Sequence, residues 1–366
     1  MWMERIEEYV RRDRVDEAVR LILSEGDGVV KAELLAELLK RVTRLDDYRY
    51  VKRELLRCRY EAPDRKTKAL ILSVIGEALL SAGDEKEGIK FLREAMSVAR
   101  GIGIEAWRAE ALIGVALNLV RAGFYDDALY LFNEAFRAVK AVEGKEPEKA
   151  LRLFRKLGDS MVFSVEWIDS GEWAVEFLRE ASQVYEHAGL GIPAKTARAK
   201  AALIERAVAG DIQFLRRILA EDWLDGAVLM ARYMPPDVKG GAFLEISFWL
   251  LANGRKDLGE QVFNDAFDLL SRFGISDRYL SGIAMDFVKL GYPDLAMRLV
   301  RLIRNDELSS RVLARVAVEY LHEGDELMAR TIAFSIPNET IKSKVLQQIG
   351  GGGNVGYEQG LPLTRG

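Results

Sequence analysis

The chain has 366 residues, of which 49% are hydrophobic and 30% are charged, and its formal net charge is −4. This composition supports a continuous apolar core under a surface of mixed charge, and it lacks the strong positive charge that is typical of nucleic-acid-binding proteins. The single cysteine, Cys58, excludes an intramolecular disulfide, and no apolar run reaches the roughly 18 residues that would span a bilayer. Glutamates within the first ten residues argue against a secretion signal, so we expect a cytoplasmic protein that does not enter a membrane.

Amide side chains are scarce, with 7 Asn and 6 Gln residues against 57 acidic and 53 basic residues. Depletion of these thermolabile groups together with an excess of ionic residues is typical of hyperthermophile proteins. We therefore expect a thermophilic protein that unfolds irreversibly only well above about 70 °C.

The first sixty residues predict a half unit, in which Ala18 is the small residue of a second helix, followed by helices at about 29–43 and 46–58. From residue 69 onward, pairs of small residues recur twelve positions apart within one frame of large apolar residues. The apolar residues lie four and one positions before the first small residue and three positions after it, which places them on one stripe of a helix. The five pairs are Gly76 and Gly88, Ala116 and Ala128, Ser247 and Gly259, Ala284 and Ala296, and Ala317 and Ala329.

The spacing of twelve suits two antiparallel helices joined by a tight turn, with a small residue on each where the backbones approach. A glycine lies seven positions after the first small residue of every pair, where it can end a helix in the left-handed conformation. Each pair therefore predicts one helical hairpin.

These offsets resemble the tetratricopeptide repeat family, which places large apolar, Gly or Ala, large apolar, Ala, aromatic and Ala residues in this order within about 34 residues. No unit has the family's tryptophan at the opening apolar position or its closing proline, and Ile303 and Ile336 stand where alanine is expected. The resemblance implies an all-α superhelix, or solenoid, of antiparallel helical hairpins with about 18–20 helices, and such arrays usually bind rather than catalyse. It covers residues 69–102, 109–142, 240–273, 277–304 and 310–336.

Between residues 146 and 234 the pattern is weaker. The run Phe177–Ala181 repeats Phe91–Ala95 letter for letter, and a further hairpin is predicted at 193–221 with its turn at Gly210.

The clearest break is Met234-Pro235-Pro236, because a proline pair stops a helix. It is either a turn between repeats or a hinge between two arms. We accordingly divide the chain into an N-terminal array at 1–234, a C-terminal array at 235–349 that continues the solenoid, and a glycine-rich flexible tail at 350–366. The tail is either a disordered or expression-derived segment or a peptide that docks into a helical groove through Tyr357 and residues 361–363.

In the resembled family, the first helix of each repeat lines the inner groove of the superhelix. Carried over by position, the groove is strongly apolar, and an exposed apolar strip marks an interaction site. It predicts that an apolar peptide or helix binds there; the alternative is that the groove is filled and these residues are core. The groove residues are Ile113, Leu117, Val120, Arg121, Leu244, Phe248, Leu251, Met285, Val288 and Lys289.

Converging catalytic groups are scarce. His187 and His322 lie 135 positions apart, and no glycine-rich phosphate loop follows a predicted strand. We expect no catalytic residues, no metal and no cofactor, and hence a non-enzymatic protein–protein interaction scaffold or adaptor whose partner is a protein or peptide. Self-association, including the tail in the groove, is left open, and nucleic acid is not the expected partner.

Two other functions stay open. The first is a nucleic-acid-binding helical solenoid that uses the basic stretch at 195–217, and the second is an all-α enzyme whose site cannot be read from the sequence.

Overall fold

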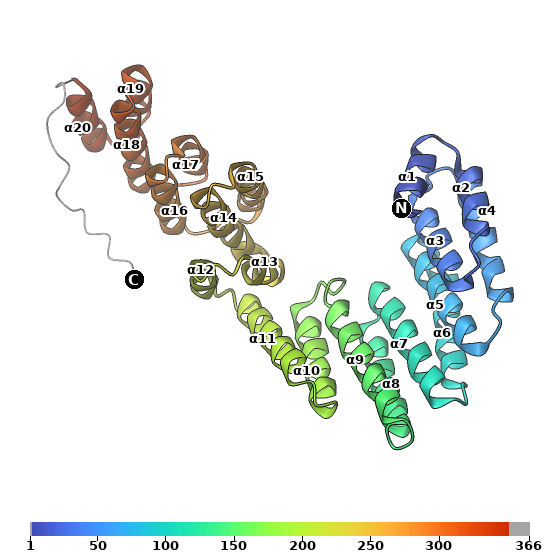
Figure 1. Cartoon of the computed structure of the whole chain (residues 1–366). Helices are drawn as coiled ribbons and strands as arrows, with labels where there is room; N and C mark the ends of the chain where they lie inside the picture. Colours follow the sequence, from blue (N-terminus) through green and yellow to red (C-terminus); the bar gives the residue numbers. More distant parts are fainter. Residues whose placement is uncertain (1, 351–366) are drawn as a thin grey trace. The chain divides into compact units, whose positions relative to one another are not determined.

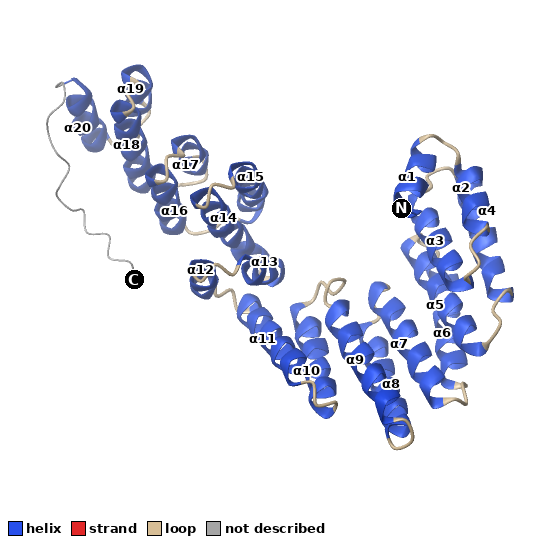
Figure 2. Ribbon diagram, viewed as in Figure 1, coloured by secondary structure: helices blue, strands red, loops and turns tan. Residues whose placement is uncertain are grey.

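A computed structural model describes residues 2–350, with side chains from residue 4 onward (Figure 1). Within that range the chain forms twenty α-helices and one short 3-10 helix, η1, and no strand (Figure 2). The predicted all-α class and the predicted number of helices are therefore confirmed. Of the predicted tail at 350–366, only Gly350 is among the described residues, and it is the last residue of α20 (Glu339–Gly350).

Two compact units make up the chain, and the division falls between Glu205 and Arg206. The N-terminal unit contains α1 (Trp2–Arg11), α2 (Val15–Leu23), α3 (Gly28–Arg41), α4 (Leu45–Arg57), η1 (Cys58–Tyr60), α5 (Arg65–Ser81), α6 (Glu85–Arg100), α7 (Glu105–Arg121), α8 (Tyr125–Glu143), α9 (Pro147–Ser164), α10 (Gly171–His187) and most of α11 (Gly191–Val208). The C-terminal unit contains α12 (Ile212–Ala220), α13 (Leu224–Tyr233), α14 (Pro236–Ala252), α15 (Lys256–Phe273), α16 (Asp277–Lys289), α17 (Pro293–Val300), α18 (Asp306–His322), α19 (Glu326–Phe334) and α20 (Glu339–Gly350).

The division lies inside α11 rather than at the proline pair on which the sequence-based boundary was placed. Met234 and Pro235 link α13 to α14, and Pro236 is the first residue of α14. Both α12 and α13 pack against α14 within the C-terminal unit, so the proline pair lies at a junction between helices of one unit.

Consecutive helices pack as hairpins, and the first helices of successive hairpins also pack on one another. In the N-terminal unit, α5 pairs with α6 and α7 with α8, and α3, α5, α7 and α9 follow one another in direct contact (Figure 1). In the C-terminal unit, α14, α16, α18 and α20 form the equivalent series. This pattern is that of a helical repeat, in which each hairpin buries its apolar face against its neighbours.

The small-residue pairs lie where the two helices of a hairpin meet. A Cβ atom built on Gly76 would lie 2.7 Å from Leu92 Cγ and 2.9 Å from the Gly88 carbonyl oxygen, so only hydrogen fits at this position. The turn that follows uses Gly83 at a φ of 84°, in the left-handed region that favours glycine. The glycines at the same position of the other four predicted units, Gly123, Gly254, Gly291 and Gly324, have the same backbone conformation.

Candidate functional site

Half of the ten residues predicted for the groove are not on the surface. Leu244, Leu251 and Val288 belong to a single apolar core in the C-terminal unit that also contains Phe263 and Phe287. For these residues the structure matches the alternative interpretation, in which they are core. The five buried residues are Ile113, Val120, Leu244, Leu251 and Val288.

The other five retain solvent contact and fall into two sets. Leu117 is partly buried and Arg121 is exposed in the N-terminal unit. In the C-terminal unit, Phe248 and Met285 are partly buried against the core, and Lys289 is exposed. Phe248 contacts Phe287 edge-on, with ring centroids 5.7 Å apart, so its ring contributes to the core as well as to the surface.

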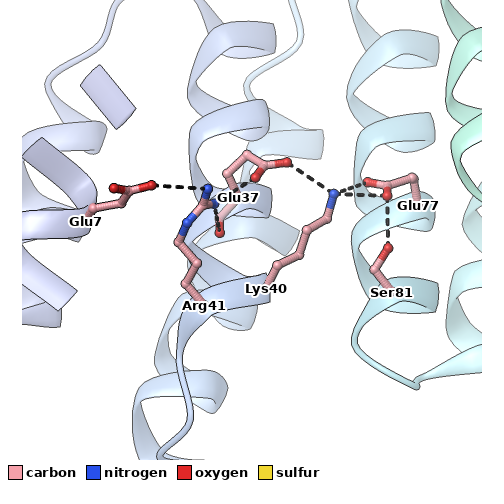
Figure 3. Close-up of polar contacts among 6 residues, drawn as sticks. All are labelled: Glu7, Glu37, Lys40, Arg41, Glu77 and Ser81. Atoms are coloured by element: carbon pink, nitrogen blue, oxygen red, sulfur yellow. Dashed lines mark hydrogen bonds and ion pairs between the residues drawn. The ribbon is translucent and has the colours of Figure 1, made fainter. Parts of the chain in front are cut away.

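In the N-terminal unit, α1, α3 and α5 are joined by a chain of charged side chains (Figure 3). Lys40 Nζ, on α3, lies 2.9 Å from Glu77 Oε2 on α5 and 3.2 Å from Glu37 Oε1 on its own helix. Glu77 is only 5% exposed, and its Oε1 also accepts a hydrogen bond from Ser81 Oγ at 2.9 Å. A buried carboxylate needs such partners, because burying an unpaired charge lowers the stability of the folded protein by roughly several kcal/mol.

Arg41 extends this chain of charges toward α1. Its Nη1 donates to Glu37 Oε2 at 2.7 Å and to the Glu37 carbonyl oxygen at 3.0 Å, and its Nη2 lies 3.8 Å from Glu7 Oε1 (Figure 3). Burial raises the pKa of Glu37, but the hydrogen bonds from Arg41 and Lys40 outweigh it and lower that pKa below its ordinary value. Glu37 is therefore held as a carboxylate.

One helical turn earlier, Glu33 behaves in the opposite way. Its side chain reaches solvent, yet crowding by the surrounding protein raises the pKa of its carboxyl group. The charge of Arg121, on α7, acts against this rise, whereas Asp27 and Glu37 add to it. Glu33 and Arg121 thus place opposite charges on first helices that are two hairpins apart.

Beside these charges, α5 and α7 share a buried neutral contact. Asn118 Nδ2 donates to Ser73 Oγ at 2.8 Å, and Ser73 Oγ donates to the Leu70 carbonyl oxygen at 2.8 Å. The pair fixes the register of two neighbouring first helices.

An aromatic group adjoins Arg121 at the end of α7. The guanidinium carbon of Arg121 lies 4.4 Å from the centre of the Trp167 ring, and Trp167 packs edge-on against Phe163, with centroids 4.5 Å apart. Phe163 lies in the last turn of α9 and is 47% exposed, while Leu117 lies one turn before Arg121 on α7. We call Leu117, Arg121, Phe163 and Trp167 the aromatic–arginine cluster.

The sequence does not point to the charged network, and of the aromatic–arginine cluster it predicts Leu117 and Arg121 as groove residues but not Phe163 or Trp167. Glu37, Lys40 and Arg41 lie in a helix without a clear pair of small residues, so its register with the repeats was not visible. Trp167 follows α9, in the stretch where the pattern weakens. The signal that could have found the cluster is the closeness in sequence of two large aromatic residues, Phe163 and Trp167.

Among the described residues of the C-terminal unit, one buried carboxylate lies between first helices. Glu245, on α14, is 7% exposed, and its Oε1 lies 2.5 Å from Arg216 Nη2 on α12 and accepts a hydrogen bond from Tyr279 Oη on α16 at 2.7 Å. Tyr279 is so enclosed that burial, together with the Glu245 charge, raises the pKa of its phenol well above the ordinary value. Three successive first helices therefore meet at one carboxylate.

The groups capable of nucleophilic or metal chemistry lie apart from one another. Burial, with a contribution from Glu61, raises the pKa of the Cys58 thiol to about 11, so the thiol is protonated at neutral pH. His187 Nε2 lies 3.2 Å from Glu143 Oε2, and its ring packs against Phe154; His322 belongs to the other unit. In the part of the chain that the structure describes, no three His, Cys, Asp or Glu side chains are grouped so as to hold a metal ion.

The basic stretch at 195–217 is divided between the two units, and most of its arginines are paired. Arg198 contacts Glu186, Arg206 Nη1 lies 3.0 Å from Asp211 Oδ2, and Arg216 pairs with Glu245. Arg217 packs on the Phe214 ring at 5.4 Å. Paired arginines contribute little free positive charge.

Comparison with known proteins identifies the fold. No family model and no curated protein sequence matches this chain. Among solved structures, that of Ton1535 from Thermococcus onnurineus NA1 superposes with a TM-score of 0.57 and 20% identity, covering 95% of this chain and 99% of the other. Nearly the whole chain therefore shares its fold with this protein.

Two further solved structures align less closely. A circular tandem repeat protein with a novel repeat topology and enhanced subunit contact surfaces has a TM-score of 0.25 and 14% identity, over 96% of this chain and 87% of the other. BtubC from P. vanneervenii has a TM-score of 0.28 and 17% identity, over 56% of this chain and 92% of its own.

None of the helices in residues 2–350 combines the length and the apolar character that crossing a membrane requires.

Proposed function

We propose that this chain is a non-enzymatic scaffold, built from divergent tetratricopeptide-like hairpins, that binds an apolar segment of a partner protein on the first helices of its N-terminal unit. The repeat assignment is supported by the five small-residue pairs, the left-handed glycine after each first helix and the direct stacking of successive first helices. The missing tryptophan and proline of the resembled family make the hairpins divergent.

The aromatic–arginine cluster is the observation that carries the proposal. Tryptophan and arginine are enriched among the residues that dominate binding energy at protein interfaces, where they are surrounded by apolar side chains. Here the Arg121 guanidinium already lies over Trp167, and the exposed ring of Phe163 adds apolar surface beside them. An apolar side chain of a partner would cover Phe163 and Trp167, while Arg121 would donate hydrogen bonds to a carboxylate or a backbone carbonyl oxygen of the partner beside them.

Site-specific photo-crosslinking tests the location of the interface. A benzophenone amino acid replaces Phe163 in one variant and Tyr130, a 52% exposed residue of α8, in the matched control. We expect the Phe163 variant to crosslink one protein from native lysate at high yield and the Tyr130 variant to crosslink none. Equal crosslinking from both positions, or none from either, would contradict the proposal.

Affinity for the crosslinked partner then tests the cluster itself. Phe163→Ser should weaken binding by about tenfold or more, because truncation of a central interface aromatic costs about 2 kcal/mol. Leu327→Ser, at an 80% exposed residue of α19 in the other unit, is the control and should bind like the wild type. If binding instead rises when the chain is cut after Gly350, the C-terminal tail competes for the site.

A further inference from the structure

We propose that a second site, on α4 and η1 of the N-terminal unit, binds a small phosphorylated molecule. The site is a surface pocket of about 350 Å³. Its lining contains five cationic side chains, a leucine and a tyrosine, and no carboxylate. These residues are Arg49, Lys52, Arg53, Leu56, Arg57, Arg59 and Tyr60.

The helical spacing brings the cations together. Arg49, Arg53 and Arg57 are separated by four residues each, so they form one stripe along α4, with Lys52 beside it and Arg59 following in η1. Like charges at this spacing destabilise a helix. A stripe of this kind therefore needs anions nearby.

The chain supplies some of these anions from outside the pocket lining. Glu54 Oε1 lies 3.1 Å from Arg53 Nε, and its Oε2 lies 2.8 Å from Arg57 Nη1. Lys52 Nζ lies 2.5 Å from Asp84 Oδ2 and 2.7 Å from Glu87 Oε2, both on the α6 side. Arg49 is held only loosely, with its Nη1 3.7 Å from Asp46 Oδ1.

Arg59 is the least compensated of the five. Among the described residues no carboxylate lies within ion-pair distance of it. Its Nη2 donates to Tyr60 Oη, and its guanidinium carbon packs over the rings of Tyr60 at 4.5 Å and Phe91 at 5.6 Å. Its Nε is buried and has no hydrogen-bond acceptor. A buried N–H without an acceptor is uncommon and costs free energy, and a ligand oxygen would reach it only after the guanidinium group turns toward the pocket.

The chemistry of the lining selects phosphate. The planar guanidinium group presents paired N–H donors that match phosphate oxygens, and four arginines offer several such pairs. Tyr60 is 76% exposed and offers a flat ring at the edge of the pocket. The volume is at the small end of the range for ligand pockets, about 300–1,000 Å³, which favours a compact molecule with two or three phosphoryl charges.

Isothermal titration calorimetry of the full chain with pyrophosphate, ATP and adenosine tests the site. We expect pyrophosphate and ATP to bind, adenosine not to bind, and both affinities to fall as salt is raised, because exposed charges are screened. A much tighter affinity for ATP than for pyrophosphate that is lost in Tyr60→Ala would assign the ring contact to Tyr60. If neither pyrophosphate nor ATP binds at millimolar concentration in low salt, the proposal is overturned.

Variants locate the binding. Arg49→Glu removes a 68% exposed cation with one weak partner, so the fold should survive, and pyrophosphate affinity should fall by about tenfold, as expected for a lost charged hydrogen bond. Arg49→Gln is the milder variant and should give a smaller loss. The matched control is Arg152→Glu on α9, which makes the same charge change at an exposed position away from the pocket and should alter affinity less than about twofold. An equal loss in the control would show that net charge, and not this pocket, governs binding.

Discussion

The hairpins α5–α6 and α14–α15 solve the same packing problem in different ways. In the first, Gly76 and Gly88 meet with no side chain between them, and each glycine would place a Cβ under 3 Å from the carbonyl oxygen of the other. In the second, Ser247 stands in place of the first glycine, and its Oγ donates to the Gly259 carbonyl oxygen at 2.8 Å. The sequence pattern shows only that a small residue is required at this position. In α5–α6 the requirement comes from the close approach of two backbones, and in α14–α15 the small residue also donates a hydrogen bond across the hairpin.

The two units also differ in how they hold a buried carboxylate between first helices. Glu77 is neutralised by a lysine shared with Glu37, within a network that continues through Arg41 toward Glu7. Glu245 is held by one arginine and one tyrosine, and Arg216 also packs over the Tyr279 ring at 5.6 Å. In the N-terminal unit, the buried carboxylate is therefore part of a network of several ion pairs, whereas in the C-terminal unit it depends on a single ion pair and one hydrogen bond.

The largest effect is expected from breaking the contact between the glycines. Gly76→Ala inserts a Cβ 2.9 Å from the backbone oxygen of Gly88 and should destabilise α5–α6 by about 3 kcal/mol, more than the helix propensity gained. Ser247→Ala should cost α14–α15 only about 1 kcal/mol, the value of one hydrogen bond. Local opening free energies from hydrogen exchange would measure both.

Gly282→Ala is the control for these substitutions, because a Cβ at this exposed position of α16 meets nothing within 4 Å. It should stabilise its helix by up to about 1 kcal/mol. A similar loss at Gly76 and Ser247 would remove the distinction between the two hairpins.

The next largest effect is expected from removing the cationic partner of each buried carboxylate, Glu245 and Glu77. Arg216→Met leaves Glu245 with the Tyr279 hydroxyl alone, and it should destabilise α14 by about 2 kcal/mol, the cost of breaking a buried pair after allowance for the partial exposure of Arg216. Lys40→Met should cost α5 about 1 kcal/mol, because Glu77 keeps Ser81 and Glu37 keeps Arg41.

Hydrogen exchange in α14 and α5 compares the two variants directly. Arg216→Lys should recover only part of the loss, since an ammonium group cannot reproduce the planar contact with Tyr279. A larger loss of stability from Lys40→Met than from Arg216→Met would contradict the view that the buried carboxylate of the C-terminal unit depends on a single ion pair.

The fold could be predicted because it depends on local spacing. The small pair at twelve positions and the glycine at seven are requirements of a single hairpin, and they are visible within one repeat, as Gly76, Gly83 and Gly88 show. The division of the chain between Glu205 and Arg206 could not be predicted, because it falls inside α11, where composition does not change.

The surface was harder to predict than the fold. The exposure of a side chain on a first helix depends on how closely neighbouring hairpins stack. The spacing of residues in the sequence does not indicate that distance. Ile113 and Val120, on α7 between α5 and α9, are 0% and 1% exposed, whereas Leu117 on the same helix keeps contact with solvent. The sequence does not predict the charged network because its contact between helices joins residues 37 positions apart, Lys40 and Glu77.

The smallest expected effect is the pH dependence of stability that Glu33 and Glu37 of α3 produce. Glu37 has a lowered pKa, so its contribution to stability is present above the ordinary value of 4.5 and is lost as the pH falls through its folded-state pKa. Glu33 has a raised pKa, so its charged form penalises the folded state at neutral pH, and the penalty disappears as the pH falls through its folded-state value. At neutral pH, Glu37→Gln should therefore destabilise α3, whereas Glu33→Gln should stabilise it. Each change should amount to about a few tenths of a kcal/mol, because both side chains reach solvent. Urea unfolding at neutral and acidic pH would measure the two differences, and both should shrink on acidification. Effects of the same sign would mean that the two glutamates, one turn apart on α3, do not experience different surroundings.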